Sequence, residues 1–302
     1  MPIRFAPAVM SLFGLALAWR TVSESVDWID PMASVLSIVA VLFGLVTLGS
    51  IVLHLTSRSA LIETFHHPQL KILPACLTVG LMLLSGLLAP HLPTFARGLI
   101  WVAAVGHLGL LAWLLNGWFA GSTPLEQVTP VWFIPTVGNI VIPIGAVAVG
   151  ESILGWVGFS IGLILWLALL PIVVFRLIHA APLPPENEAS QLVLVAPPAI
   201  GSVAWVTLTG GDQLILGVML LSVASFLALT LVPMMARVML RSFSPANWSF
   251  GFPLAALASG LVLYADALDL IVLAYAGLFV LVSVSLIVMW LLIASARILV
   301  KN

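Results

Sequence analysis

Charged residues are scarce in this chain of 302 residues. Asp, Glu, Lys and Arg together make up 7% of it, whereas a soluble domain carries about a quarter, and hydrophobic residues make up 62%. So few charges cannot cover a surface that faces water. This composition excludes soluble enzymes, nucleic-acid-binding proteins and secreted scaffolds, and it predicts an all-α integral membrane protein.

Cysteine and catalytic motifs are also nearly absent. Cys76 is the only cysteine, so no internal disulfide and no thiolate cluster for zinc or iron–sulfur can form. The chain has no HExxH helix, no nucleotide-binding loop and no evident Ser-His-Asp arrangement. We therefore expect no catalytic residue, no metal site and no cofactor: the protein is not an enzyme. A net charge of −1 leaves no basic patch for nucleic acid.

Ten apolar stretches lie between the charged and proline-rich segments, and each is a candidate membrane span. The odd-numbered stretches hold 15 to 19 residues and the even-numbered ones 23 to 27. A span of about 20 residues crosses the hydrocarbon core, so the short ones need shelter from longer neighbours. The ten stretches are 5–19, 32–55, 72–89, 98–120, 131–149, 153–175, 192–208, 214–236, 248–265 and 270–296.

Each odd-numbered stretch contains a proline near its start, followed by small or apolar residues and a glycine. Successive prolines are 67, 61, 63 and 55 residues apart, which indicates five repeats of about 60 residues that start near positions 1, 66, 127, 190 and 246 of a single domain, 1–302. Prolines are also common in membrane helices generally, which is the plainer explanation of each one. The five, expected to kink the helices that line a pore, are Pro7, Pro74, Pro135, Pro198 and Pro253.

Two crossings per repeat give every copy the same orientation in the membrane. We therefore expect five parallel helical hairpins in a quasi-five-fold ring, related by an axis along the membrane normal. The short, proline-bearing helices belong inside, where freed carbonyls meet water or neighbouring helices. The centre of the ring should then be a pore.

The distribution of charge predicts the topology. Eight basic and four acidic residues fall on the side of the N-terminus, but two basic residues, Arg20 and Arg97, and seven acidic residues fall on the other. By the positive-inside rule both termini are cytoplasmic. The seven acidic residues expected outside are Glu24, Asp27, Asp30, Glu151, Asp212, Asp266 and Asp269.

No charged residue lies in the middle of a span. The chain therefore lacks the charged residues within the membrane that proton pumps and sodium-coupled carriers usually need. Backbone N–H dipoles can still favour anions in such a pore. Hydroxyl and amide side chains follow each proline and are candidate pore-lining residues, although Ser and Thr also bond carbonyls of their own helix. They are Ser11, Thr78, Thr136, Asn139, Ser202 and Ser259.

Only the fifth repeat places an aromatic ring directly before its proline. The residues at this position are Ala6, Leu73, Ile134, Pro197 and Phe252. A phenylalanine across a ring of small residues closes a pore sterically and by dewetting. An ordinary packed aromatic is the alternative, and composition alone favours it.

Three histidines could indicate haem binding or proton transfer, since paired histidines can hold haem and a single one can relay protons. His107 lies in the middle of the fourth stretch, and His54 and His179 lie near the ends of the second and sixth. All three are on even-numbered helices, expected outside the ring. We expect hydrogen-bonded or interfacial histidines.

Five segments in order resemble the tellurite-resistance/dicarboxylate transporter family, which includes bacterial TehA and the plant guard-cell slow anion channels. They are FAPAVMSLFGLALAWR, FHHPQLKILPA, TPVWFIPTVGN, VLVAPPAIGS and NWSFGFP, and they extend along most of the chain. The resemblance implies five hairpins around a pore, a homotrimer with one pore per protomer, and a gate at Phe252. Pro253 departs from the glycine that the most similar TehA-type sequences carry.

The function implied is a passive channel for small inorganic or organic anions in the bacterial inner membrane, with the lipid bilayer as its surroundings. The alternative in the same fold is a proton-coupled C4-dicarboxylate carrier or an exporter of tellurite or other toxic anions. A carrier usually offers a cationic contact to a carboxylate at mid-membrane, and no Arg or Lys is available there.

Overall fold

The computed structural model describes residues 2–25, 29–121 and 123–301, and within them it contains helices and no strand. Ten helical segments are long and apolar enough to cross a membrane. The predicted fold class, an all-α membrane protein with ten spans, is confirmed. Asp27, counted above among the outer charges, lies outside the described residues.

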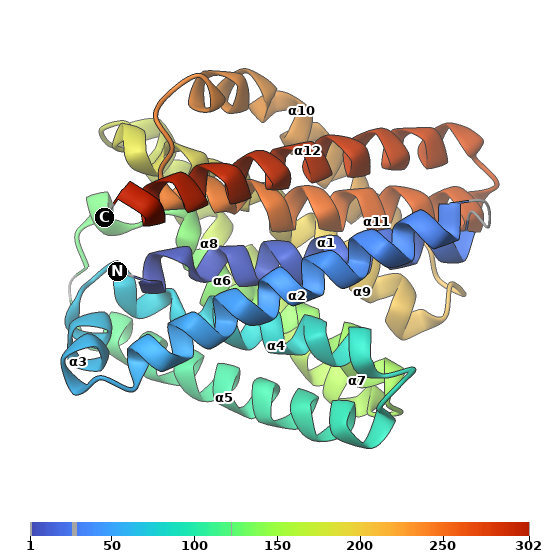
Figure 1. The fold of residues 1–302 in the computed structure, drawn as a ribbon, viewed down its shortest axis with the longest axis horizontal. Coiled ribbons are helices and arrows are strands. Elements are labelled where there is room, and N and C mark those ends of the chain that lie inside the picture. The colour runs from blue at the N-terminus through green and yellow to red at the C-terminus, as the bar shows by residue number, and fades with distance from the viewer. Residues whose placement is uncertain (1, 26–28, 122, 302) are drawn as a thin grey trace.

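The ten spans form five successive pairs (Figure 1). The odd-numbered spans are Pro2–Glu24, Leu70–Leu88, Pro130–Ala148, Pro185–Thr209 and Pro245–Leu268. The even-numbered spans are Asp30–Leu55, Pro93–Ala120, Ser152–His179, Ile215–Met239 and Ile271–Ile298. The first, seventh and ninth spans have 23, 25 and 24 residues and are longer than expected. α1 (Ala6–Ser25) continues beyond Arg20, and 3-10 segments open the seventh span at Pro185 and the ninth at Pro245.

Burial separates the two classes of span. In the most apolar part of each odd-numbered span, 67 to 83% of the residues are buried, against 17 to 33% in the even-numbered spans. The outer spans expose large apolar side chains such as Val46, Phe119 and Leu229, as helices that face lipid do. The odd-numbered spans are therefore the inner helices.

The inner helices contact one another in a closed sequence. α1 packs on α4 (Pro74–Leu88), α4 on α7 (Ile142–Ala148), α7 on α9 (Ala196–Thr209), α9 on α11 (Gly251–Leu268), and α11 on α1. The tightest outer contacts join each inner helix to its own partner, as between α1 and α2 (Asp30–Leu55) or α11 and α12 (Ile271–Lys301).

Every inner span opens with 3-10 structure that gives way to α-helix at the repeat's proline. Pro7, Pro74, Pro135, Pro198 and Pro253 each lie within the first three residues of an α-helix. A proline there interrupts no hydrogen bond of the helix, since the first N–H groups have no partner inside it. The helix type therefore changes at the start of the span, and none of these five prolines interrupts an α-helix from within, where a kink was expected. The 3-10 segments are Pro2–Phe5, Leu70–Ile72, Pro130–Trp132, Pro185–Val195 and Pro245–Phe250.

The third inner span is broken a second time. α6 (Phe133–Val137) ends in a 3-10 segment, Gly138–Val141, before α7 begins. Pro143 has no N–H to offer the carbonyl of Asn139, and that oxygen faces α8 (Ser152–His179) at Gly158, where an added Cβ would lie 2.7 Å from it. The absence of a side chain at Gly158 lets the outer helix approach the break closely.

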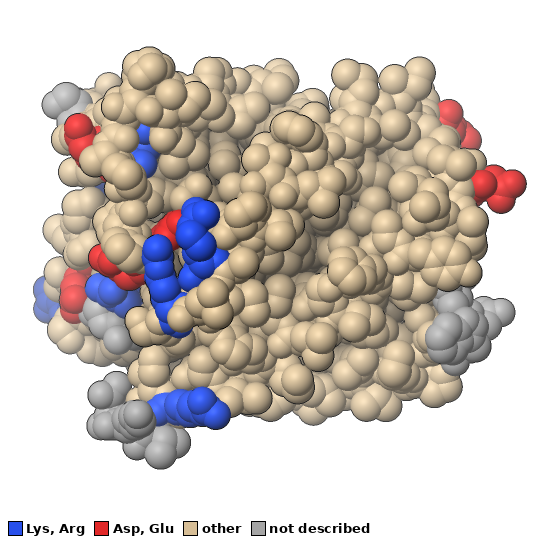
Figure 2. Space-filling model, turned by 90° about the horizontal axis from the view of Figure 1, so that it is seen from above, with Lys and Arg blue, Asp and Glu red and all other residues tan. Residues whose placement is uncertain are grey.

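Charged side chains gather at the two ends of the bundle. On the face that Figure 2 shows, the Lys and Arg side chains lie at the end that carries both termini, and only acidic groups are visible at the opposite end. This matches the asymmetry read from the sequence. The orientation of the termini toward the cytoplasm stays a prediction.

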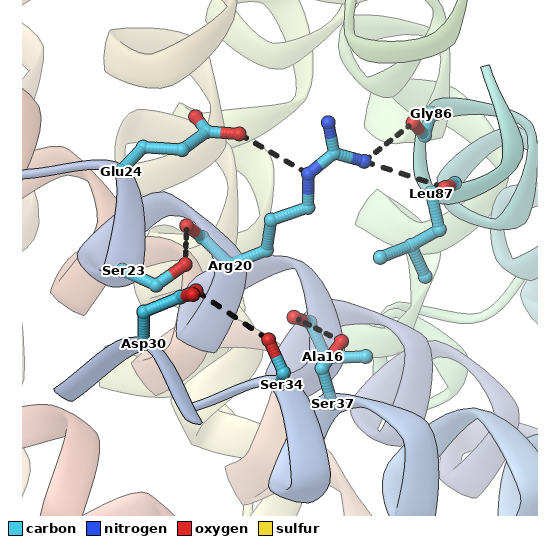
Figure 3. Close-up of polar contacts among 9 residues, drawn as sticks. All are labelled: Ala16, Arg20, Ser23, Glu24, Asp30, Ser34, Ser37, Gly86 and Leu87. Atoms are coloured by element: carbon cyan, nitrogen blue, oxygen red, sulfur yellow. Dashed lines mark hydrogen bonds and ion pairs between the residues drawn. The ribbon is translucent and has the colours of Figure 1, made fainter. Parts of the chain in front are cut away.

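The two basic residues at the far end each cap the end of an inner helix. Nη1 of Arg20 donates to the carbonyl oxygens of Gly86 and Leu87, at 3.5 and 3.3 Å, and Nε lies 3.1 Å from Glu24 (Figure 3). Nη2 of Arg97 donates to the carbonyl oxygen of Val149 at 2.8 Å. The last carbonyls of a helix have no internal partner and favour a cation, which gives a local reason for positive charge at this end.

Replacing Arg20 with Gln should therefore destabilise the protein. We expect the free energy of unfolding to fall by about 1 kcal/mol and the melting temperature in detergent by a few degrees. The matched control is Arg58→Gln, because Arg58 is exposed and forms no ion pair with a described residue. Equal melting temperatures for the two variants would contradict the capping role.

Candidate functional site

A small central cavity lies among the five inner spans. Its volume is about 40 Å³, room by size for about three water molecules. Only Ser249 and Trp248 bring polar side-chain atoms to its lining, and the indole N–H of Trp248 donates to Ser295 at 3.1 Å. Every inner span contributes to the lining; one residue from each, in chain order, is Met10, Val79, Ile134, Pro197 and Phe252.

A larger cavity adjoins the first at the end that carries the termini, and we call it the vestibule. Its volume is about 210 Å³, and it shares Pro7, Ile134 and Ser249 with the central cavity. The 3-10 segments and nearby loops form its wall, so all five repeats contribute here too. One residue from each repeat is Arg4, Lys71, Trp132, Asn187 and Ser244.

The vestibule carries more positive than negative charge. Arg4 and Lys71 line it, opposed by the carboxylate of Glu186. Neither basic side chain forms an ion pair with a described residue. Unpaired cations in a concave wall raise the local concentration of anions.

Two ion pairs fix the fourth-repeat wall of the vestibule. The carboxylate of Glu188 pairs with Arg237 at 3.2 Å and also with Arg241, both at the end of α10 (Ile215–Met239). The hydroxyl of Ser244 donates to the carbonyl oxygen of Glu186 at 2.9 Å. The ion pairs hold the long 3-10 segment against the outer helix of its own repeat, and the Ser244 bond holds it against the start of the fifth inner span.

Phe252 lies in the first turn of α11 and lines the central cavity. Its side chain is 7% exposed. The ring lies against α1 at Gly14, where an added Cβ would stand 2.9 Å from Cδ2 of Phe252. Gly14 therefore provides the space that the ring occupies.

Close packing between α1 and the start of the fifth repeat holds this arrangement. The hydroxyl of Ser11 lies 2.8 Å from the carbonyl oxygen of Trp248 and 2.9 Å from that of Pro7. A Cβ at Gly251 would stand 2.5 Å from Cβ of Ser11. The backbone that carries Phe252 is thus bonded directly to the first inner helix.

The six hydroxyl and amide residues predicted to line a pore are not among the residues that line either cavity. Most of them bond a carbonyl within their own span, as membrane Ser and Thr often do. Thr136 donates to Trp132, Ser202 to Ala199, Ser259 to Ala255, and the amide of Asn139 to Thr136. Ser11 also reaches Trp248, and Thr78 contacts His107 of α5 (Pro93–Ala120), an outer helix.

The prolines and the residues before them lie nearer to the cavities. Pro7 lines both cavities and Pro253 lines the central one, whereas Pro74, Pro135 and Pro198 line neither. Among the residues just before these prolines, Ile134, Pro197 and Phe252 line the central cavity and Leu73 lines the vestibule.

The aliphatic wall was missed from the sequence. Met10, Val79, Val137, Val141 and Ile200 line the central cavity, although the search was for polar groups. All of them lie two to six positions after a repeat's proline, so counting forward from the proline without regard to polarity locates them.

The described residues contain no group of three or more His, Cys, Asp or Glu that could hold a metal ion. Of the three histidines considered above, His107 is fully buried and bonded to two inner spans. The lining of the central cavity offers no acid, base or nucleophile beyond the hydroxyl of Ser249. This arrangement provides a charged vestibule that adjoins a small, mostly apolar cavity.

Comparison with known proteins identifies the family. The family model described as "Voltage-dependent anion channel" (SLAC1) matches residues 1–298. The chain belongs to this family. It is a family of channels and transporters, and the ten apolar helices agree with the expectation of a multi-pass membrane protein.

Two relatives represent its plant and bacterial branches. The S-type anion channel SLAH1 of Arabidopsis thaliana is 28% identical over 171 residues, which is 56% of this chain and 44% of the plant protein. The tellurite resistance protein TehA homolog of Haemophilus influenzae is 23% identical over 265 residues, covering 86% and 80% of the two chains. This chain spans about half the length of the plant channels that it matches.

We expect engineered cysteines that line the cavities to be alkylated faster than buried cysteines that line neither cavity. In a Cys76→Ala background, which removes the only native thiol, Ser249→Cys should be alkylated by iodoacetate at least about tenfold faster than Ser259→Cys, because thiol reactivity follows access and thiolate character. Both serines are buried, but only Ser249 lines the cavities. Mass spectrometry measures the rates, and a faster reaction at position 259 would contradict the path described.

Proposed function

We propose that this protein is a passive channel for small anions, with a pore along the axis of the five inner spans and Phe252 as its gate. The observation that carries this proposal is the lining of the central cavity, to which every repeat contributes residues within six positions of its proline. A cavity between two or three helices would not need five copies of one motif.

The closed sequence of contacts from α1 through α4, α7, α9 and α11 supports a quasi-five-fold ring of parallel hairpins. A single hydrophobic core joins these helices, in keeping with one domain over 1–302. The pore would run from the vestibule through the central cavity to the far end of the bundle.

An apolar constriction is a barrier to ions in its own right. An anion that enters the central cavity loses water and finds no described charged side chain in the lining, so passage requires a wider and wetter pore. Phe133, Trp248 and Phe252 bring aromatic rings to this lining. Of these, the proposed gate is Phe252, and rotation of its side chain would widen the pore.

The vestibule supports a preference for anions. Arg4 and Lys71 against Glu186 leave an excess of positive charge at its wall. The asymmetry of charge supports cytoplasmic termini, which would place the vestibule on the cytoplasmic side, and the bacterial relative supports a bacterial inner membrane. The homotrimer implied by the resemblance stays a prediction.

A carrier for C4-dicarboxylates or an exporter of tellurite is the second function that the sequence allows. The relative from Haemophilus influenzae is named for tellurite resistance. Substrate binding by a carrier usually needs fixed polar contacts at mid-membrane, and the apolar lining of the central cavity weighs against them. The hydroxyls predicted to line the pore would serve in an open state whose lining differs from this one.

Removing the ring of Phe252 should open the pore. We expect Phe252→Ala to raise chloride or nitrate conductance in planar bilayers by about tenfold or more, which corresponds to removing about 1.4 kcal/mol of barrier. Arg58→Gln is the control, because it neutralises an exposed charge that lies at the start of a short helix, Arg58–His66, and lines neither cavity. It should change conductance much less.

Two outcomes of this experiment count against the proposal. Unaltered conductance in a properly folded Phe252→Ala protein would show that Phe252 is not the gate. Flux that saturates, depends on a proton gradient and exchanges dicarboxylates favours the carrier.

The contact between Gly14 and the ring gives an independent test. A Cβ at position 14 would stand 2.9 Å from Cδ2 of Phe252, so Gly14→Ala forces the ring away from α1 and toward the central cavity. We expect lower conductance in Gly14→Ala and no effect of the same change in a Phe252→Ala background, because only the ring couples the two sites. Additive effects in the double variant would show that Gly14 does not act through Phe252.

A further inference from the structure

His107 occupies an unusual position for an ionisable side chain. It lies in the middle of α5, and its imidazole is completely buried. Nε2 lies 3.1 Å from the carbonyl oxygen of Pro135, and Nδ1 lies 2.6 Å from the hydroxyl oxygen of Thr78. One outer-helix side chain thus joins the second and third inner spans.

The hydrogen bonds around the ring can be counted. A carbonyl oxygen only accepts, so Nε2 carries a proton toward Pro135. The hydroxyl of Thr78 has one proton but two acceptors in reach: Nδ1 and the carbonyl oxygen of Ala75, at 2.9 Å. A neutral imidazole accepts the Thr78 proton at Nδ1, and the carbonyl oxygen of Ala75 keeps the helical N–H of α4. In an imidazolium, Nδ1–H donates to Thr78 and Thr78 donates to Ala75. Rotation of one hydroxyl therefore gives the ring a partner on both sides in either protonation state.

The ring also lies directly behind the wall of the central cavity. A Cβ at Gly138 would stand 2.6 Å from Cε1 and 2.8 Å from Nε2 of His107. Gly138 itself lines the central cavity, together with Val79. Because position 138 has no side chain, the imidazole approaches the cavity to within the thickness of the backbone.

Few other ionisable groups lie near this ring. Among the elements packed against α5, α6, the segment Gly138–Val141 and α7 carry none, and α4 carries only Cys76. The short helix α3 (Arg58–His66) touches α5 through Phe65 and Trp113, and its Arg58, Glu63 and His66 are exposed. On α5 itself, Arg97 is ten residues away and pairs with Glu151.

We propose that His107 is a proton-binding site linked to the central cavity: protonation of its imidazole and entry of a small anion into the cavity favour each other. Moving an imidazolium from water into a buried site is costly, and an anion a few ångströms away offsets that cost. The proton comes from bulk water and binds Nδ1, and no covalent bond between heavy atoms changes. By linkage, the effect of the proton on the anion equals that of the anion on the proton. The proposal rests on the anion pathway proposed above.

Proton uptake tests the linkage without relying on conductance. Replacing gluconate with nitrate at constant ionic strength should make purified protein in weak buffer at about pH 6.5 take up protons, at most one per chain. We expect His107→Gln to abolish this uptake and His91→Gln to leave it unchanged, since His91 is an exposed residue between α4 and α5. No uptake by the wild type, or equal uptake by His107→Gln, overturns the proposal.

Conductance provides a second readout. In a Phe252→Ala background, chloride conductance should rise about tenfold as pH falls from about 8 to 5. A tenfold effect corresponds to about one pKa unit of coupling between the proton and the anion. His107→Gln should flatten this pH profile. Thr78→Val, which removes the acceptor for Nδ1–H, should shift the profile to lower pH, and Thr78→Ser should restore it. A pH profile that is unchanged in both His107→Gln and Thr78→Val overturns the linkage. If the protein shows no conductance but still takes up protons with nitrate, the proposed channel function fails and the proposed proton site at His107 stands.

Discussion

A bilayer supplies no hydrogen bonds, so each backbone polar group in a span needs a partner inside the protein or in a water-filled cavity. This constraint explains the recurring local features of the chain. The five repeat prolines lie in first turns, where a proline interrupts no hydrogen bond of its own helix. Arg20 and Arg97 bond the free carbonyls at the ends of inner helices. Hydroxyls such as those of Thr136 and Ser202 bond carbonyls within their own span, and so bring no polarity to the cavity wall.

The same constraint limits the kind of pore that these helices can enclose. Helices whose polar atoms are already paired present aliphatic side chains to one another, and the central cavity between them is narrow and apolar. Of the two cavities, only the vestibule has charged residues in its lining, among them Arg4 and Lys71. In the pathway that we propose, anions gather at one end and cross a short dry barrier, and a single ring at that barrier is sufficient for control.

The sequence predicted the fold further than the site. Breaks in the apolar runs located the ten spans, and the spaced prolines paired them into five repeats. The predicted alternation of span lengths was only partly correct, since the seventh and eighth spans both have 25 residues. The register of each inner helix was harder to predict. Whether Ser202 faces the axis or its own helix depends on a hydrogen bond with Ala199, and the 3-10 start of a span turns the helix by an amount that no residue pattern records. Gly14 and Gly138 leave space that the rings of Phe252 and His107 occupy. Their roles could not be predicted from the sequence, because the positions of those rings depend on the fold.

The central claim is that ions pass along the axis between the inner spans, and an experimental structure of Phe252→Ala protein with bromide tests it most directly. The account predicts anomalous density for bromide in the vestibule and in the enlarged central cavity, beside Met10, Val79 and Ile134. Bromide found only between helices that face lipid, or between protomers, with the central cavity empty, would contradict it.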